Sequence, residues 1–149
     1  MSLRMAFLVC LMAVGQLHAQ TLGEYWNTAE EESKYYKIVE VPIPEGMVME
    51  AGSFDVLADN RLAIGTRRGD IFLVSGAFDE NPQPRYKRFA SGLDEVLGLS
   101  YKDGAFYVTQ QAEVTRITDS DGNGRADRFE TLSDVWGFRN YHEFAFGSK

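Results

Sequence analysis

The sequence has few of the residues that carry thiol, disulfide and imidazole chemistry. Its 149 residues include one cysteine, Cys10, and two histidines, His18 and His142. The longest uncharged, mostly apolar stretch is residues 5–15, whereas a membrane-spanning helix needs about 20 such residues. These shortages exclude a disulfide framework and a transmembrane helix, and they leave almost no choice of catalytic imidazole.

Residues 1–19 have the organisation of a secretory signal peptide. Arg4 gives a positive start, residues 5–15 form the apolar region, and a small-residue cleavage site ends at Ala19. A buried N-terminal strand or helix is the alternative interpretation. Cleavage predicts a periplasmic or secreted protein, and it removes Cys10 and His18 together with the leader.

Basic charge is also scarce. Lys and Arg number 15 against 22 Asp and Glu, which gives a formal net charge of −7. An acidic exported chain without a basic stripe is a poor partner for nucleic acid. The sequence also lacks a phosphate-binding glycine loop, a nucleophile elbow and a Cys-x-x-Cys-His haem attachment site.

What the sequence does contain is a repeat with a period of 43 residues. Residues 54–74 match residues 97–117 in their order of apolar alternation and turns, with Thr66 on Thr109, Ile71 on Val114 and Val74 on Ile117. A repeat of about 40 to 45 residues made of four short strands is typical of β-propeller blades, and propellers close with about four to eight of them. The sequence therefore predicts an all-β, partial β-propeller that is the N-terminal piece of a longer protein.

The repeat also sets the expected domain organisation. We expect a polar lead-in at 20–36 and an incomplete propeller domain at 37–149, with blades at about 53–90 and 96–133 and a third starting near 143. The predicted strands are 53–58, 61–66, 70–75, 85–90, 96–101, 105–109, 113–118 and 127–133. Lys37 to Val41 alternates like an edge strand. Asp59-Asn60 and Asp103-Gly104 predict two-residue hairpin turns.

A calcium-loop pattern spans residues 119–130, DSDGNGRADRFE. Side-chain oxygens stand at loop positions 1, 3, 5, 9 and 12, a glycine stands at position 6, and position 7 offers its carbonyl; the predicted ligands are Asp119, Asp121, Asn123, Arg125, Asp127 and Glu130. The flanks are strands instead of helices, which predicts a structural ion in a blade hairpin. A polar, glycine-rich turn without metal is the alternative.

Blade topology places another group of polar side chains at one end of the channel. Arg67 and Arg68 lie between the second and third strands of the first blade, and Gln110 and Gln111 occupy the equivalent loop of the second. An arginine can hold a carboxylate or phosphate by two hydrogen bonds, or it can be a solvated surface charge. His142 ends an inter-blade loop at the same end and can act as a general base, although a lone histidine can equally be a packing residue.

Three segments carry a resemblance to a known family: LAIGTRRGDIFLV, GLSYKDGAFYVTQQAEVTRITDSDGNGRAD and YHEFAFG. Together, over residues 37–149, they resemble the N-terminal part of the glucose/sorbosone dehydrogenase-like propellers, especially large secreted bacterial proteins in which a propeller precedes a cytochrome c module. The resemblance implies that His142 removes a sugar hydroxyl proton and that pyrroloquinoline quinone accepts the hydride. It also implies that Arg67 or Arg68 corresponds to a charged pair of the family beside the cofactor. Gln110 and Gln111, in the equivalent loop of the next blade, are the other predicted cofactor-binding residues.

Two functions therefore compete at the level of the sequence. The first is an exported quinone-dependent oxidoreductase of sugars or polyols, with a cytochrome c module downstream as a possible electron partner. The second is a non-catalytic, calcium-stabilised secreted propeller that binds carbohydrate or a protein partner. Basic residues that clamp the quinone in later blades would favour the first function.

Overall fold

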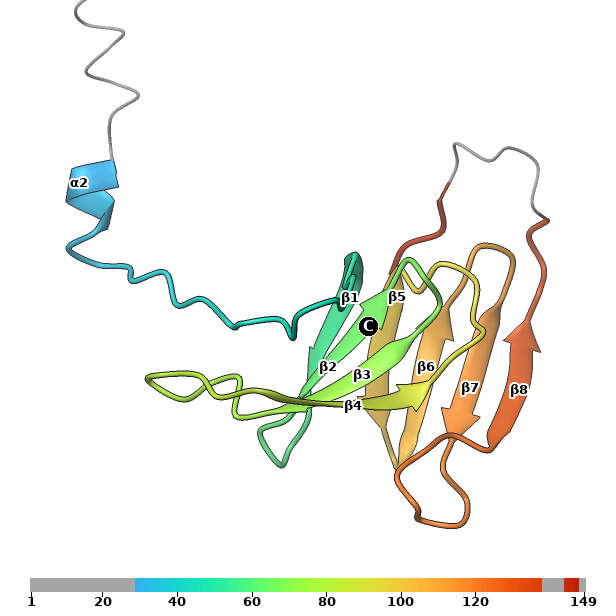
Figure 1. Cartoon of the computed structure of the whole chain (residues 1–149). Coiled ribbons are helices and arrows are strands. Elements are labelled where there is room, and N and C mark those ends of the chain that lie inside the picture. Colours follow the sequence, from blue (N-terminus) through green and yellow to red (C-terminus); the bar gives the residue numbers. More distant parts are fainter. Residues whose placement is uncertain (1–28, 138–143, 148–149) are drawn as a thin grey trace, which may run out of the picture. The chain divides into compact units, whose positions relative to one another are not determined.

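In the part of the chain that the structure describes, eight strands form two consecutive meanders, and each meander is one four-stranded antiparallel sheet (Figure 1). The structure, a computed structural model, describes residues 29–137 and 144–147. The first sheet contains β1 (Ala51–Val56), β2 (Leu62–Thr66), β3 (Ile71–Ser75) and β4 (Arg85–Ala90). The second contains β5 (Gly98–Lys102), β6 (Ala105–Thr109), β7 (Val114–Thr118) and β8 (Arg128–Ser133).

The all-β prediction is confirmed, and each of the eight predicted strands ends within two residues of an observed one. The one helix among the described residues is the single turn α2 (Ala29–Glu32), whose residues are all exposed. The chain divides into a unit that ends at Ile38 and a unit spanning Val39–Lys149, which holds both sheets. No helix in the described ranges is long and apolar enough to cross a membrane.

The two inner hairpins differ in length, which the sequence pattern did not reveal. Asp103 and Gly104 form the predicted two-residue turn, with φ of 49° and 80°. In the first sheet the amide of Leu57 donates to the carbonyl of Arg61 at 2.9 Å, so the loop has three residues and closes with Asn60 at φ 65°. The prediction of a two-residue turn at Asp59-Asn60 was therefore wrong.

This difference shifts the register of the repeat. Val74 and Ile117, 43 residues apart, occupy the same place in the third strand, and the same register shift follows Ile71 and Val114. Their partners on the second strand, Leu62 and Phe106, are 44 residues apart. Thr66 therefore corresponds to Gln110, and the predicted match between Thr66 and Thr109 was wrong by one residue.

The strand pairings define two faces on each sheet. The front face of the first sheet carries the rows Phe54, Ile64, Phe72, Arg88 and Val56, Leu62, Val74, Tyr86. The corresponding front face of the second carries Leu99, Val108, Thr115, Thr131 and Tyr101, Phe106, Ile117, Phe129. Side chains alternate between faces along a strand, so the intervening residues form the back face.

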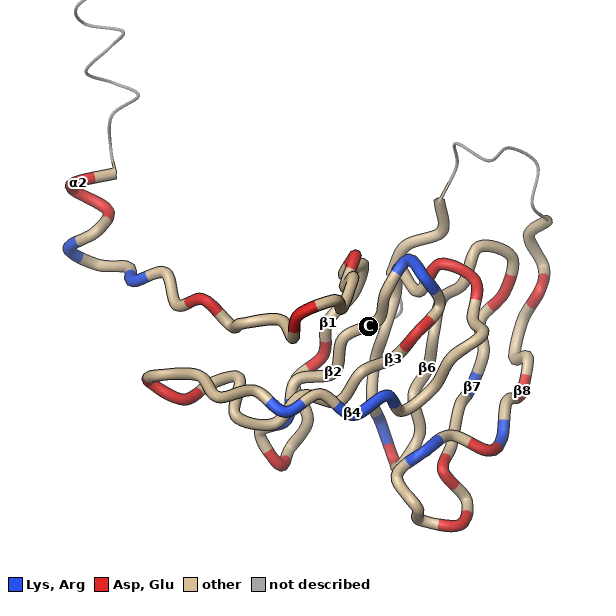
Figure 2. The backbone as a smooth tube through the Cα atoms, in the orientation of Figure 1, with Lys and Arg blue, Asp and Glu red and all other residues tan. Residues whose placement is uncertain are grey.

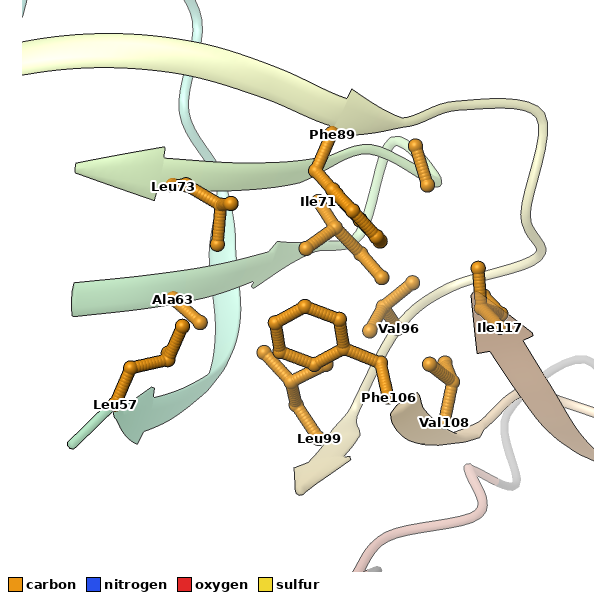
Figure 3. Packing of buried hydrophobic residues seen from close by; sticks show 11 residues of the cluster. Leu57, Ala63, Ile71, Leu73, Phe89, Val96, Leu99, Phe106, Val108 and Ile117 are labelled. Carbon is orange, nitrogen blue, oxygen red and sulfur yellow. The ribbon is translucent and has the colours of Figure 1, made fainter. Parts of the chain in front are cut away.

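The main core lies between the back of the first sheet and the front of the second (Figure 3). Its back-face members include Ala63, Ile71 and Leu73, and Phe89 contacts Phe106 of the facing sheet with ring centroids 5.1 Å apart. Burying a side chain of this size contributes about 1.5 to 3 kcal/mol. The sheets therefore stack back to front, with corresponding faces pointing the same way.

A second cluster covers part of the front of the first sheet. Ile64, Phe72 and Val74 are buried there under Met49, with Val41 and Met47 packed against them. Residues 37–41 are not a strand, so the predicted edge strand was wrong. These residues instead lead into an irregular segment, which includes Pro42 and Pro44, that crosses the sheet. Tyr86 on β4 donates its hydroxyl proton to the Pro42 carbonyl at 3.2 Å.

Candidate calcium loop and ligand-binding end

The loop between β7 and β8 carries most of the predicted metal ligands. The hairpin is closed where the amide of Asp127 donates to the Thr118 carbonyl at 3.0 Å. Gly122 and Gly124 inside it have φ of 73° and 81°, a backbone region that favours glycine. The loop projects from the end of the second sheet and is rich in acidic positions (Figure 2).

Three carboxylates converge in this loop. One oxygen from each of Asp119, Asp121 and Asp127 lies within 4.8 Å of the other two. Calcium binds oxygens at 2.3–2.6 Å, so two ligands on opposite sides of one ion are separated by about this distance. Three hard, anionic oxygen donors at this spacing fit a calcium ion.

Backbone amides already orient these carboxylates. The amides of Asn123 and Gly124 donate to Asp119 at 3.1 and 2.7 Å. Ser120 donates to Asp127 through its hydroxyl at 2.6 Å and through its amide at 2.8 Å. The Ser120 hydroxyl is the main reason that the pKa of Asp127 is lowered from its usual value.

Asn123 and Arg125, which were also predicted as ligands, form hydrogen bonds with other groups of the protein. The side-chain oxygen of Asn123 accepts a proton from the amide of Arg125 at 2.8 Å, and its carbonyl accepts one from Lys87 Nζ at 3.0 Å. Lys87 belongs to the neighbouring sheet, so the sequence pattern gave no sign of it. The contact that Arg125 makes within the loop is this hydrogen bond from its backbone amide to Asn123.

Glu130, at position 12 of the pattern, lies away from the three carboxylates. It pairs with Arg116 at 2.6 Å and with Arg128 at 3.0 Å on the back of the second sheet. The hydrogen bond from Arg116 is the main cause that lowers the pKa of Glu130. The three predicted aspartate ligands therefore lie together. Glu130 instead forms an ion pair with Arg116 on the neighbouring strand.

At the other end of the strands, three loops meet as the topology predicts. The amide of Leu93 donates to the Gly69 carbonyl at 3.1 Å, and that of Gln111 donates to the Asp94 carbonyl at 3.2 Å. Trp136, which follows β8, donates its indole proton to the Gln111 carbonyl at 3.1 Å. We call these loops, residues 67–69, 91–96 and 110–113, the ligand-binding end, after the role that the sequence predicts for them.

Both predicted arginines lie at this end and both are paired. Arg67 contacts Glu95 at 3.1 Å and lies 5.2 Å from the centre of the Phe144 ring, while Arg68 contacts Glu50 at 3.3 Å. Each cation is balanced by a carboxylate, so these residues by themselves do not fit the anionic pyrroloquinoline quinone. Sequence reasoning missed Glu50 and Glu95, which share a positive φ, 38° and 46°.

The buried side chain of Gln110 forms hydrogen bonds that connect the loops of the ligand-binding end. It is 6% exposed, its oxygen accepts the amide proton of Asp94 at 2.6 Å, and its Nε2 donates to Thr115 at 2.6 Å and to Glu113 at 3.0 Å. Its amide is thus fully engaged within the protein. Of the two predicted glutamines, Gln111 is the one with a partly exposed side chain.

The predicted base His142 lies outside the described residues, whereas Phe144, two positions later, contacts Arg67 at the ligand-binding end. Phe144 therefore lies at this end. No family model, curated protein or solved structure matches this chain.

Proposed function

We propose that the two sheets are two successive blades of an exported β-propeller that binds a small polyhydroxy ligand and is stabilised by calcium. The observation that carries the proposal is the back-to-front stacking of two like sheets. Successive blades related by rotation stack in this way, because each presents the same face to the blade before it. Two sheets facing each other in a sandwich would bring the same face of both together.

The chemistry of the ligand-binding end supports a sugar or polyol as the ligand. Arg67 with Glu95 and Arg68 with Glu50 place donors beside acceptors, with no net charge in either pair. A hydroxyl group both donates and accepts hydrogen bonds, so a polyol can use both members of each pair. An anion would meet the carboxylates as well as the guanidinium groups.

Binding should be measured by isothermal titration of a panel of sugars and polyols against the whole chain, with Arg67→Gln as the test variant. The loss of one charge-assisted hydrogen bond should weaken binding about tenfold or more. Arg125→Gln, at the opposite end, is the matched control and should bind as the wild type does. A panel without a ligand, or equal effects of the two variants, would contradict this proposal.

Oxidation of that ligand is a second candidate function, favoured by the contact with Arg67 of Phe144, which follows His142 by two residues in the sequence. A bound quinone would accept hydride, and later blades would have to supply its cationic contacts. His142→Gln should then lower sugar-dependent reduction of an artificial acceptor about 10² to 10⁴-fold. The assay requires added quinone and calcium and the protein with any further blades. Wild-type turnover in the variant would remove His142 from the mechanism.

A further inference from the structure

Asn123 and Gly124, in the loop between β7 and β8, form the one Asn-Gly dipeptide in the sequence. The backbone nitrogen after an asparagine can attack the side-chain amide carbon, and a glycine leaves that attack unobstructed because it has no Cβ. The fold requires a glycine here for a separate reason. Gly124 has φ of 81°, and a Cβ on it would lie 1.9 Å from Lys87 Nζ. A chemically labile pair is therefore built into this loop, with Asn123 exposed.

The peptide group that joins Asn123 to Gly124 is hydrogen-bonded at both ends to charged side chains. Its carbonyl accepts a hydrogen bond from Lys87 Nζ at 3.0 Å, and its N–H donates to Asp119 Oδ2 at 2.7 Å. A cation on the carbonyl draws electrons from the peptide group, so the N–H proton is more easily removed. A carboxylate within hydrogen-bond distance of that proton can accept it while the nitrogen attacks.

The side-chain amide of Asn123 is oriented by two further hydrogen bonds. Its Oδ1 accepts the amide proton of Arg125 at 2.8 Å, which closes a turn between the side chain and the backbone two residues on. The same N–H would stabilise the negative charge that develops on Oδ1 when a nucleophile bonds to the side-chain carbon. Nδ2, the atom that would leave, donates to Asp121 Oδ2 at 2.9 Å.

We propose that Asn123 deamidates spontaneously in the folded protein and that Asp119 and Lys87 promote the reaction. The Gly124 nitrogen bonds to the side-chain carbon of Asn123, and its proton passes to Asp119. Asp119 returns that proton to Nδ2, the bond between Nδ2 and the carbon breaks, and ammonia leaves a five-membered succinimide. One water molecule opens the ring to aspartate or isoaspartate, so water is consumed, ammonia is released and nothing is oxidised. The reaction requires neither calcium nor the polyhydroxy ligand, and it goes beyond the proposed function.

Either product would change the β7–β8 loop. Aspartate at position 123 adds a fourth carboxylate to the loop in which those of Asp119, Asp121 and Asp127 already converge. Isoaspartate directs the backbone through the former side chain, which adds one methylene to the chain and would move the Gly124 amide away from Asp119. The charge or the backbone of the loop would therefore change as the protein ages.

Mass spectrometry of the peptide that contains residue 123 follows the reaction, because a hydroxyl group replaces an amino group. The whole chain should deamidate at Asn123 faster when folded than in guanidinium chloride, although a fixed backbone ordinarily slows this reaction. Asp119→Asn keeps a hydrogen-bond acceptor and removes the base. It should lower the rate about 10-fold to 100-fold, at or below the lower end of what a positioned general base contributes. Lys87→Met removes the cation from an exposed position and should also lower the rate.

Asp127→Asn is the matched control, because it removes one carboxylate of the same cluster. Asp127 is bonded to Ser120 instead of to the Asn123–Gly124 peptide group, so this variant should deamidate at Asn123 at the wild-type rate. Slower deamidation in the folded chain than in the unfolded one would overturn the proposal. So would an unchanged or faster rate in Asp119→Asn or in Lys87→Met, or a rate that falls equally in Asp127→Asn.

Discussion

At the scale of single residues, the ligand-binding end depends on close approaches of the backbone that few side chains allow. Gly69 has φ of 80°, and a Cβ there would lie 1.9 Å from the carbonyl oxygen of Leu93. Leu93 lies in the connection between the two sheets, and its own amide donates a hydrogen bond to the carbonyl of Gly69. Gly69 therefore fixes the turn after β2 and the position of the next sheet together.

Gly69→Ala should destabilise the protein more than Gly92→Ala does. Gly92 has a similar φ of 79° but open space around the position of a Cβ, so alanine there costs only the backbone term of about 1 kcal/mol. At Gly69 the clash adds to it, for a total of about 2 to 4 kcal/mol. Urea unfolding at a fixed protein concentration gives both values. Equal midpoints for the two variants would contradict the close approach.

At the scale of elements, strand positions follow directly from the sequence, while loop lengths do not. Alternation in segments such as residues 105–109 and 113–118 reflects burial of one face, which is why the predicted strands agree with the observed ones. Corresponding turns of the two sheets differ in length by one residue, and the alternation of apolar side chains does not reveal this difference. The sequence pattern also gave no sign of Lys87, which reaches the β7–β8 loop from the other sheet, or of the ion pair between Arg116 and Glu130.

Calcium should raise the Tm by binding the β7–β8 loop. The three carboxylates of Asp119, Asp121 and Asp127 repel one another at this spacing, and calcium at ten to a hundred times its Kd adds about 1.4 to 2.7 kcal/mol by linkage. Thermal melts in millimolar calcium and in excess chelator measure the difference. Asp121→Asn should reduce it, whereas Asp59→Asn, in a turn outside the cluster, should leave it unchanged. Identical melts with calcium and chelator would make the loop an ordinary turn.

At the scale of the whole molecule, two facts connect the fold to the proposed function. The sheets stack back to front, and the connections between them gather at one end while the acidic loop projects from the other. The amide of Tyr101 donates to Asp55 at 2.6 Å and the Ser53 hydroxyl donates to the Val96 carbonyl at 2.9 Å. These hydrogen bonds join the inner strand of each sheet to the neighbouring sheet or connection, so the ligand-binding end is built on a fixed frame.

The stacking is tested most directly by nuclear Overhauser effects between phenylalanine rings. The account predicts contacts between the rings of Phe89 and Phe106, whose centroids are 5.1 Å apart, and none between Phe72 and Phe106. Phe72 lies on the front of the first sheet, which faces away from the second. Contacts between Phe72 and Phe106, with none from Phe89, would mean that the two front faces meet, and they would contradict the arrangement of the sheets as successive blades.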